Sequence, residues 1–297
     1  NCPYKKLGVR GSVRTSSELT HLRSQEGLPM ATSVEGHYGN DGIVERIVGA
    51  LTQAGHDMDN LDADVLAAAD EFHIGGREGT MHVAAAINLG PGDRLLDVGC
   101  GIGGAARFLA HSTGASVIGV DLTPEFVNAA IQLSDLVGMG AQVDFEVGSA
   151  TDLAFDDDSF DAVTMLHVGM NIENKVQMMS ELGRVCRSKG VVVVYDVTLM
   201  SEHDLPYPMP WSATPEFSFP EPASAYEAAG TEAGLEHVSS SNHYDLALKF
   251  FNEPPATPPP VSLGHLMGPR MIEMRDNAAQ AINEGLMSPV LMKFVAP

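Results

Sequence analysis

Five short apolar runs, separated by stretches long enough to be helices, constrain the fold of this chain more than any other feature. The runs are RLLDVGC (94–100), SVIGVDL (116–122), QVDFEVG (142–148), FDAVTMLHV (160–168) and GVVVVYDV (190–197). This alternation is typical of βαβ units, which build a parallel sheet with helices on both faces. We therefore predict an α/β, doubly wound, Rossmann-like fold.

The flanks of this alternation predict further elements. Apolar residues at helical spacing between residues 43 and 55 predict a helix before the first run, so residues 30–92 are expected to form an N-terminal helical cap. Residues 93–297 then form the main domain. Helical character returns at 269–285, and the apolar run at 289–296 suits a last strand of the sheet.

One late segment, residues 201–262, breaks the alternation. It holds 11 of the 18 prolines and carries Trp211, Phe217 and Phe219. Proline at this density disfavours long helices, and linkers seldom carry large aromatic residues. We therefore expect an aromatic and proline-rich insertion that forms a lid or a pocket wall.

Charge and cysteine content exclude several classes of protein. The 297 residues include 17 Lys and Arg against 39 Asp and Glu, a net charge of -22, which disfavours a nucleic-acid partner. No apolar run reaches the roughly 18 residues that cross a bilayer, so no membrane partner is expected. The three cysteines, Cys2, Cys100 and Cys186, form neither a disulfide framework nor a metal-binding pair. We expect a reducing compartment and no metal site.

The first 29 residues differ in composition from the rest. They contain five basic and two acidic residues and show no apolar periodicity. This composition is typical of a disordered leader or of the end of a transit segment. The expected location is therefore the cytoplasm, or a plastid or mitochondrion if the segment is a transit remnant.

A glycine-rich turn follows the first apolar run and allows two interpretations. Gly99, Gly101 and Gly104 satisfy GxGxxG, and Asp121 follows at the spacing of a ribose-binding acid, which would indicate a dinucleotide and an NAD-dependent oxidoreductase. Alternatively, Asp97 opens a D-x-G-x-G-x-G pattern that ends at Gly103. A carboxylate at the strand tip would repel a pyrophosphate but would stabilise the ammonium and sulfonium of S-adenosylmethionine.

Longer stretches resemble a known family. LLDVGCGIGGAARFLA (95–110), VIGVDLTPEFV (117–127) and GSATDLAFDDDSFDAVTMLHVGMNI (148–172) are similar to motifs I to IV of class I S-adenosylmethionine-dependent methyltransferases. Shorter flanking segments, HYG (37–39), DEFHIGGREGT (70–80) and GHLMGP (264–269), resemble the small-metabolite group of sarcosine/dimethylglycine type.

The resemblance implies a seven-stranded, mostly parallel sheet that binds S-adenosylmethionine and releases S-adenosylhomocysteine. Asp97, Gly99, Gly101 and Gly103 would line the methionine side, and Asp121 and Leu122 would hold the ribose and adenine. The family usually has an acid before Ala150, where this chain has Ser149, so a serine hydroxyl and local backbone would contact the adenine instead. His167 is a further candidate for contact with the cofactor.

Candidate residues for the methyl acceptor follow from position and residue type. His167 stands at the end of the fourth run, where open α/β sheets bind ligands, and could act as the catalytic base or orient a carboxylate. A hydrogen-bonded, partly buried histidine is the alternative interpretation. The other acceptor-side candidates are Tyr38, Phe72, His73, Met170, Asn171, Trp211, His243 and His265.

These features predict a methyltransferase that acts on a small polar metabolite. The acceptor would be an amine of sarcosine/dimethylglycine type, methylated on nitrogen, or a thioether acid of methylthio-hydroxybutyrate type, methylated on sulfur, in osmolyte synthesis. A base is required only for an acceptor that arrives protonated, as an amine does. The alternatives are an NAD-dependent oxidoreductase and a catalytically silent S-adenosylmethionine-binding module. A small-molecule acceptor is the expected partner, and a homodimer is a further expectation.

Overall fold

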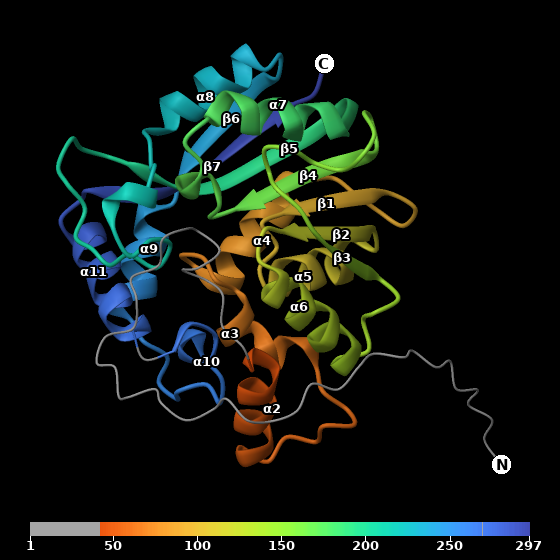
Figure 1. Cartoon of the computed structure of the whole chain (residues 1–297), viewed down its shortest axis with the longest axis vertical. Helices are drawn as coiled ribbons and strands as arrows, with labels where there is room; N and C mark the ends of the chain where they lie inside the picture. Colours follow the sequence, from red (N-terminus) through yellow and green to blue (C-terminus); the bar gives the residue numbers. More distant parts are fainter. Residues whose placement is uncertain (1–41, 269) are drawn as a thin grey trace, which may run out of the picture. The chain divides into compact units, whose positions relative to one another are not determined.

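A seven-stranded sheet organises the chain in a computed structural model that describes residues 42–268 and 270–297. Its strands run in the order β3-β2-β1-β4-β5-β7-β6 (Figure 1). The first five pair in parallel, whereas β7 is antiparallel to both β5 and β6. The strands are β1 (Arg94–Val98), β2 (Ser116–Asp121), β3 (Val143–Val147), β4 (Phe160–Leu166), β5 (Cys186–Leu199), β6 (Glu236–Asn242) and β7 (Met287–Val295). The predicted doubly wound, mostly parallel seven-stranded sheet is confirmed.

Helices cover both faces of the sheet. On one face, α4 (Gly76–Ala86), α5 (Gly104–Thr113) and α6 (Pro124–Leu136) bury Val83, Leu109 and Ala130 against the strands. On the other face, α7 (Lys175–Val185) and α8 (Ala223–Glu232) do so with Leu182 and Tyr226. Central strand β5 is buried almost continuously from Val192 to Val197 because helices pack on both of its faces.

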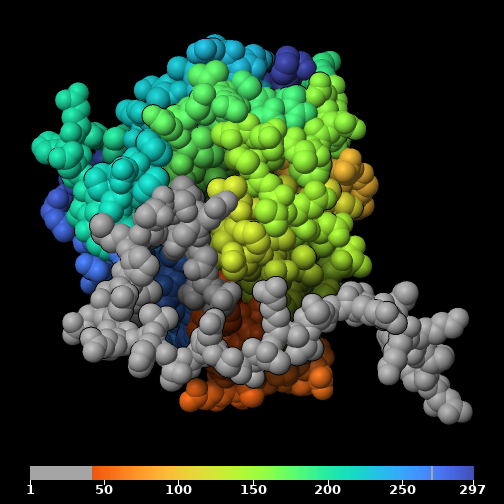
Figure 2. Space-filling view, in the orientation of Figure 1, coloured from red at the N-terminus to blue at the C-terminus, as the bar shows by residue number. Residues whose placement is uncertain are grey.

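The remaining helices lie beyond the carboxyl ends of the parallel strands. They are α2 (Ile43–Gln53), α3 (Ala67–Asp70), α9 (Tyr244–Asn252), α10 (Leu263–Met267) and α11 (Met271–Asn283), with short 3-10 turns η1 (Ala63–Leu66), η2 (Gly169–Asn171) and η3 (Pro215–Phe217). Helix α2 buries Ile43, Ile47 and Leu51 in a cluster shared with α6 and α10. Helices α2 and α8 lie at opposite ends of the described domain, α2 in orange and α8 in cyan-blue (Figure 2).

The late segment, residues 201–262, differs from its prediction. It contains α8, the edge strand β6 and α9, so the irregular backbone is confined to its two flanks. All 11 prolines lie in those flanks, and residues 223–252 contain none. The proline density of the whole window therefore concealed a proline-free stretch in which helices and a strand can form.

Two searches of the described residues gave negative results. None of the helices in 42–268 and 270–297 is long and apolar enough to cross a membrane. Within the same ranges no three His, Cys, Asp or Glu side chains are grouped so that they could hold a metal ion. The predicted leader at 1–29 and the candidate Tyr38 lie outside the described residues.

Candidate functional site

A cavity of about 540 Å³ opens at the carboxyl ends of the parallel strands. The turns after β1, β2, β3 and β4 form one side of it, and residues 70–74, the segment around Trp211 and α9 to α11 form the other. The two sides come from segments far apart in the sequence that the parallel topology brings to one edge. This is the edge at which open α/β sheets bind their ligands.

The turn after β1 depends on its glycines. Gly99, Gly101 and Gly103 have φ angles of 76°, 55° and 87°, in the left-handed region that side chains disfavour. A Cβ on Gly99 would also lie 2.1 Å from the side chain of Val168, which follows β4. Gly99 and Gly101 therefore present bare backbone to the cavity, as a ligand that contacts main chain requires, whereas Gly103 faces Arg107 and Phe145 and does not line the cavity.

Asp97 is the most unusual group in the cavity. Its side chain is 1% exposed, and its Oδ1 accepts a hydrogen bond from the Thr164 hydroxyl at 2.9 Å. Its Oδ2 is buried and has no hydrogen-bond partner among the described residues. Burial raises the pKa of Asp97 to about 7, and the nearby Asp121 adds to the rise. An unpaired buried carboxylate is costly, so this site fits a cationic ligand group.

Asp121, at the end of β2, is held by the backbone around it. Its Oδ2 accepts the amide of Gly101 at 2.9 Å, and its Oδ1 accepts the amide of Thr123 at 2.9 Å. Burial raises its pKa in spite of these bonds. Each oxygen keeps a further lone pair, so a pair of ribose hydroxyls could still bind. The neighbouring Leu122 lines the cavity and is 40% exposed, which suits a flat apolar ligand group.

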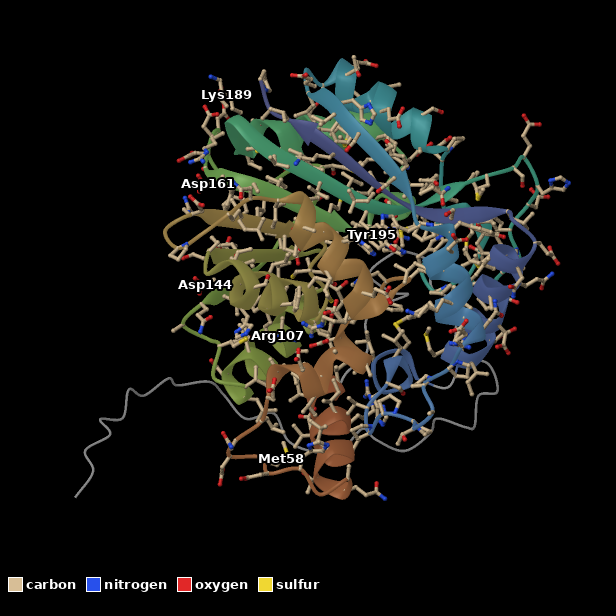
Figure 3. The ribbon with its side chains drawn as sticks, turned by 180° about the vertical axis from the view of Figure 1, so that it is seen from behind. Met58, Arg107, Asp144, Asp161, Lys189 and Tyr195 are labelled. Atoms are coloured by element: carbon tan, nitrogen blue, oxygen red, sulfur yellow. The ribbon has the colours of Figure 1, made fainter. Side chains whose placement is uncertain are left out.

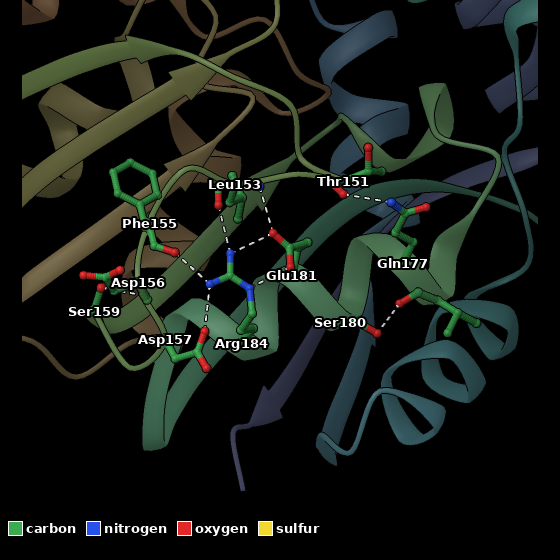
Figure 4. Close-up of polar contacts among 11 residues, drawn as sticks. Thr151, Leu153, Phe155, Asp156, Asp157, Ser159, Gln177, Ser180, Glu181 and Arg184 are labelled. Atoms are coloured by element: carbon green, nitrogen blue, oxygen red, sulfur yellow. Dashed lines mark hydrogen bonds and ion pairs between the residues drawn. The ribbon is translucent and has the colours of Figure 1, made fainter.

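The loop that carries Ser149 and Ala150 at the cavity is fixed from behind by α7 (Figure 4). Arg184 donates to the carbonyls of Phe155 at 2.7 Å and Leu153 at 2.9 Å, and also binds Glu181 and Asp157. Gln177 donates to the Thr151 carbonyl at 2.9 Å. The Ser149 hydroxyl is engaged locally with Thr151, at 2.9 Å between the two side-chain oxygens. Side chains of α7 thus hold the loop so that the backbone of Ser149 and Ala150 lies on the cavity wall.

His167 lines the cavity, but the backbone uses both of its ring nitrogens. Nδ1 lies 3.2 Å from the Tyr195 carbonyl, and Nε2 accepts the amide of Ile74 at 3.2 Å. Burial lowers its pKa to about 3, and its φ of 53° is rare for a residue with a side chain. His167 therefore ties β4 to β5 and to residue 74, which matches the alternative interpretation of this histidine and leaves no ring nitrogen for a base.

His73, unlike His167, has a ring nitrogen that no described residue engages. Its Nε2 lies 3.0 Å from the Gly76 carbonyl, so Nε2 carries the proton and Nδ1 carries the lone pair. Nδ1 makes no hydrogen bond with any described residue, and the ring lines the cavity. Nε2 is also 3.0 Å from the Thr80 hydroxyl, which donates to Glu71 Oε2 at 2.5 Å. Burial lowers the pKa of His73 to about 4, and burial raises that of Glu71 to about 7.

Four further candidates shape the acceptor side of the cavity. Met170 lines it from η2, and Phe72 from the segment before α4. Asn171 also lines it, but its side-chain amide donates to the Trp211 carbonyl at 2.8 Å and so anchors the proline-rich segment. Trp211 is 3% exposed and donates to Ser218 Oγ at 2.8 Å, so it is both core and cavity wall.

Two candidates do not line the cavity. His243 contacts His82, at 4.5 Å between ring centroids and a 53° tilt, and is the N-cap residue of α9. His265 accepts the Ser262 amide at Nδ1 and caps α10. Sequence analysis missed several residues that do line it, namely Asp70, Gln177, Phe250, Phe251, Met271 and Arg275. Those on α9 and α11 come from helices after the glycine-rich turn and strands β1 to β5, so only tertiary packing brings them to the site.

Comparisons with known proteins agree with this geometry. A family model described as a methyltransferase domain matches residues 96–194. A 2-methyl-6-phytyl-1,4-hydroquinone methyltransferase of Synechocystis sp. is 31% identical over 191 residues, which cover 63% of this chain and 58% of that protein. This chain covers only part of the curated relatives that it matches first, between 24% and 58% of their length.

Solved structures show the same fold. A geranyl diphosphate C-methyltransferase from Streptomyces coelicolor A3(2) gives a TM-score of 0.65 at 15% identity, over 91% of this chain and 100% of that chain. A provisionally named sarcosine dimethylglycine methyltransferase from Galdieria sulphuraria gives 0.56 at 16% identity, over 72% and 80%. Residues 96–194 therefore match a methyltransferase domain, and the described structure shares the fold of the solved methyltransferases.

Proposed function

We propose that this chain transfers a methyl group from S-adenosylmethionine to a small-molecule acceptor. The observation that carries the proposal is Asp97, a buried carboxylate with an unpaired oxygen in the cavity of a methyltransferase domain. When bound, S-adenosylmethionine supplies a methyl group from a sulfonium. The same buried carboxylate disfavours the dinucleotide alternative, because it would repel a pyrophosphate.

Different residues of the chain would bind different parts of the cofactor. Asp97 would pair with the methionine ammonium, and the bare backbone of Gly99 and Gly101 lets a ligand approach closely, while Gly103 allows the turn its left-handed backbone. Asp121 would accept the ribose hydroxyls with its remaining lone pairs. Leu122 and the backbone of Ser149 and Ala150 would enclose the adenine. Cofactor alignment is the main requirement, since near-attack positioning lowers a barrier by roughly 7–11 kcal/mol.

The acceptor proposal keeps both chemistries suggested by sequence, an amine of sarcosine/dimethylglycine type and a thioether acid of methylthio-hydroxybutyrate type, as steps of osmolyte synthesis. Support comes from the flanking segments around His73 and His265, which resemble the small-metabolite group. The two acceptors differ in their need for a base, because a protonated amine must lose a proton and a thioether has none to lose. We assign that proton to His73 Nδ1, the lone pair left unused by the described residues, with Glu71 and Thr80 holding the ring from behind.

Turnover with labelled S-adenosylmethionine tests the function. The panel holds N-methylated glycines, thioether acids, phosphoethanolamine, geranyl diphosphate and a prenylated hydroquinone. We expect labelled product from an amine or thioether acid. Calorimetry with S-adenosylhomocysteine separates the remaining outcomes: binding without any product indicates a silent binding module, and binding of NADH instead of S-adenosylhomocysteine would refute the proposal.

His73 and His167 make opposite predictions. His73→Gln keeps a side chain that reaches Gly76 but lacks a base, so kcat for an amine should fall by about 10² or more while kcat for a thioether changes little. His111→Gln, on the exposed end of α5, serves as the matched control. If His167→Gln, with its affinity for S-adenosylhomocysteine intact, loses amine methylation while His73→Gln retains it, the proton belongs to His167.

A further inference from the structure

The cavity wall farthest along the chain from the methyltransferase motifs is largely apolar. Helix α9 contributes Phe250 and Phe251, and α11 contributes Met271, Arg275 and Ala278. Arg275 is the only Lys or Arg among the described residues of the cavity wall. Four acidic residues line the same cavity, namely Asp70, Asp97, Asp121 and Glu173. Arg275 is thus a single positive charge in a cavity lined by several acidic residues. Such a charge is suited to bind an anionic ligand group.

The contacts of Arg275 leave it ready for a ligand. Its Nη2 lies 3.5 Å from the Phe250 carbonyl and 3.4 Å from the Phe251 carbonyl, both long for hydrogen bonds. Its Cζ lies 5.5 Å from the centre of the Phe251 ring, which holds the guanidinium by a cation-π contact. It forms no ion pair with any described carboxylate. Two carbonyls and a ring position the guanidinium, but none of them neutralises its charge.

We infer that Arg275 recognises an anionic group of the methyl acceptor, which makes the acceptor a small carboxylic acid or similar anion. The inference rests on the proposed function. Arginine presents a planar fork of donors that matches a carboxylate, and such pairs are strongest where aromatic walls exclude water. The buried carboxylate Asp97 marks the cofactor end, and Arg275 marks the acceptor end. Both residues line the same cavity, so an acceptor held by its anion at Arg275 shares that cavity with the cofactor.

The carboxylate of the cofactor is a second anion that would suit Arg275. The experiment therefore distinguishes binding of the cofactor from binding of the acceptor. Acceptor pairs that differ only in charge are compared: N,N-dimethylglycine with its amide, and a 2-hydroxy-4-(methylthio)butanoate with its amide. KM is measured for each where turnover occurs. Calorimetric Kd is measured for each acid against S-adenosylhomocysteine-saturated protein, so that binding is seen without catalysis. The variants are Arg275→Gln and Arg275→Lys, with Arg270→Gln, exposed before the same helix, as the control.

Arg275→Gln should raise KM or Kd for the acid about 10- to 100-fold, the loss expected for charge-assisted hydrogen bonds. The amide should change much less, Arg275→Lys should recover part of the acid binding, and Arg270→Gln should behave as wild type. Affinity for S-adenosylhomocysteine should stay within about twofold. A parallel fall in that affinity would assign Arg275 to the cofactor carboxylate. Equal effects on acid and amide, or a wild-type protein that binds none of the acids, would overturn the inference even where methyl transfer to an uncharged acceptor is observed. Absence of both cofactor binding and methyl transfer would instead sink the proposed function.

Discussion

A buried carboxylate without a hydrogen-bond partner on one of its oxygens destabilises the folded protein when it is ionised. Asp97 would ionise near its ordinary value of 3.8 in the unfolded chain, whereas burial raises the pKa to about 7 in the folded protein. The folded state therefore favours the protonated acid. Stability from this group is fully present below about pH 3.8 and is lost as the pH rises through about 7, and the penalty reaches the order of 4 kcal/mol at higher pH. A bound cation offsets that penalty.

Removal of the charge of Asp97 should therefore stabilise the ligand-free protein and weaken its binding of the cofactor. Asp97→Asn keeps an oxygen for the Thr164 hydroxyl and removes the charge, so the free energy of unfolding of the ligand-free protein at pH 8 should rise by a few kcal/mol. The gain should shrink toward pH 5, and affinity for S-adenosylhomocysteine should fall at least 100-fold. Denaturant unfolding at the two pH values and calorimetry measure these effects. Asp144→Asn, exposed on β3 at the opposite edge of the sheet (Figure 3), is the control. A variant less stable than wild type at pH 8 would contradict the argument.

Short elements next to the strands place the cavity residues, and η2 is the tightest of them. It follows β4 and carries Met170 and Asn171 to the cavity. Its first residue, Gly169, packs on Asp196 of β5, which is fully buried and accepts the Tyr226 hydroxyl at 3.0 Å. A Cβ on Gly169 would lie 2.4 Å from Asp196 Oδ2 and 2.8 Å from the Tyr226 ring. The turn can reach this position only as long as residue 169 has no side chain.

The same substitution at two glycines should therefore have opposite effects. Gly169→Ala should lower the free energy of unfolding by about 1–3 kcal/mol, since the new methyl group overpacks a fixed, buried network. Gly49→Ala lies on an exposed position within α2, where a Cβ meets nothing within 4 Å, and should raise stability by about 0.5–1 kcal/mol. Urea unfolding of both variants, with the acceptor KM of Gly169→Ala, measures the comparison. Equal stability changes in the two variants would show that η2 does not pack on Asp196 as described.

Elements whose signal is local were predictable, and those set by packing were not. The strands β1 to β5 were found because a buried parallel strand is a continuous apolar run. Strand β6, EHVSSSN, is a polar edge strand that pairs only with β7, so no apolar run marks it. The strand-end residues Asp97 and Asp121 were singled out by another local signal, the glycine-rich pattern that follows the first strand. The engagement of His167 by residues 93 and 28 positions away, and the arrival of Arg275 at the cavity, depend on tertiary contacts that no short pattern contains.

At the scale of the whole domain, a buried ion pair joins α3, part of the predicted helical cap, to the sheet layer. Arg107, on α5, is 2% exposed and donates to Asp70 Oδ2 at 2.7 Å, to Ser134 Oγ at 2.8 Å and to the Ile102 carbonyl at 2.9 Å (Figure 3). Asp70 ends α3 and also lines the cavity. A single guanidinium therefore connects the cap, the glycine-rich turn and two helices of the sheet layer. The cap should unfold together with the sheet and not as a separate unit.

A double-mutant cycle on this pair tests that coupling. Arg107→Met leaves Asp70 buried without its partner, so the free energy of unfolding should fall by about 3–5 kcal/mol. Asp70→Asn in the Arg107→Met background removes the stranded charge and should restore part of the loss, which makes the two effects non-additive. Arg187→Met, on an exposed arginine that pairs with Asp161 at the amino ends of β5 and β4, should cost under about 1 kcal/mol. Far-ultraviolet circular dichroism should report a single transition in each variant, because the cap and the sheet share buried charge. Separate transitions in wild type, or additive effects of the two substitutions, would show that Arg107 does not couple them.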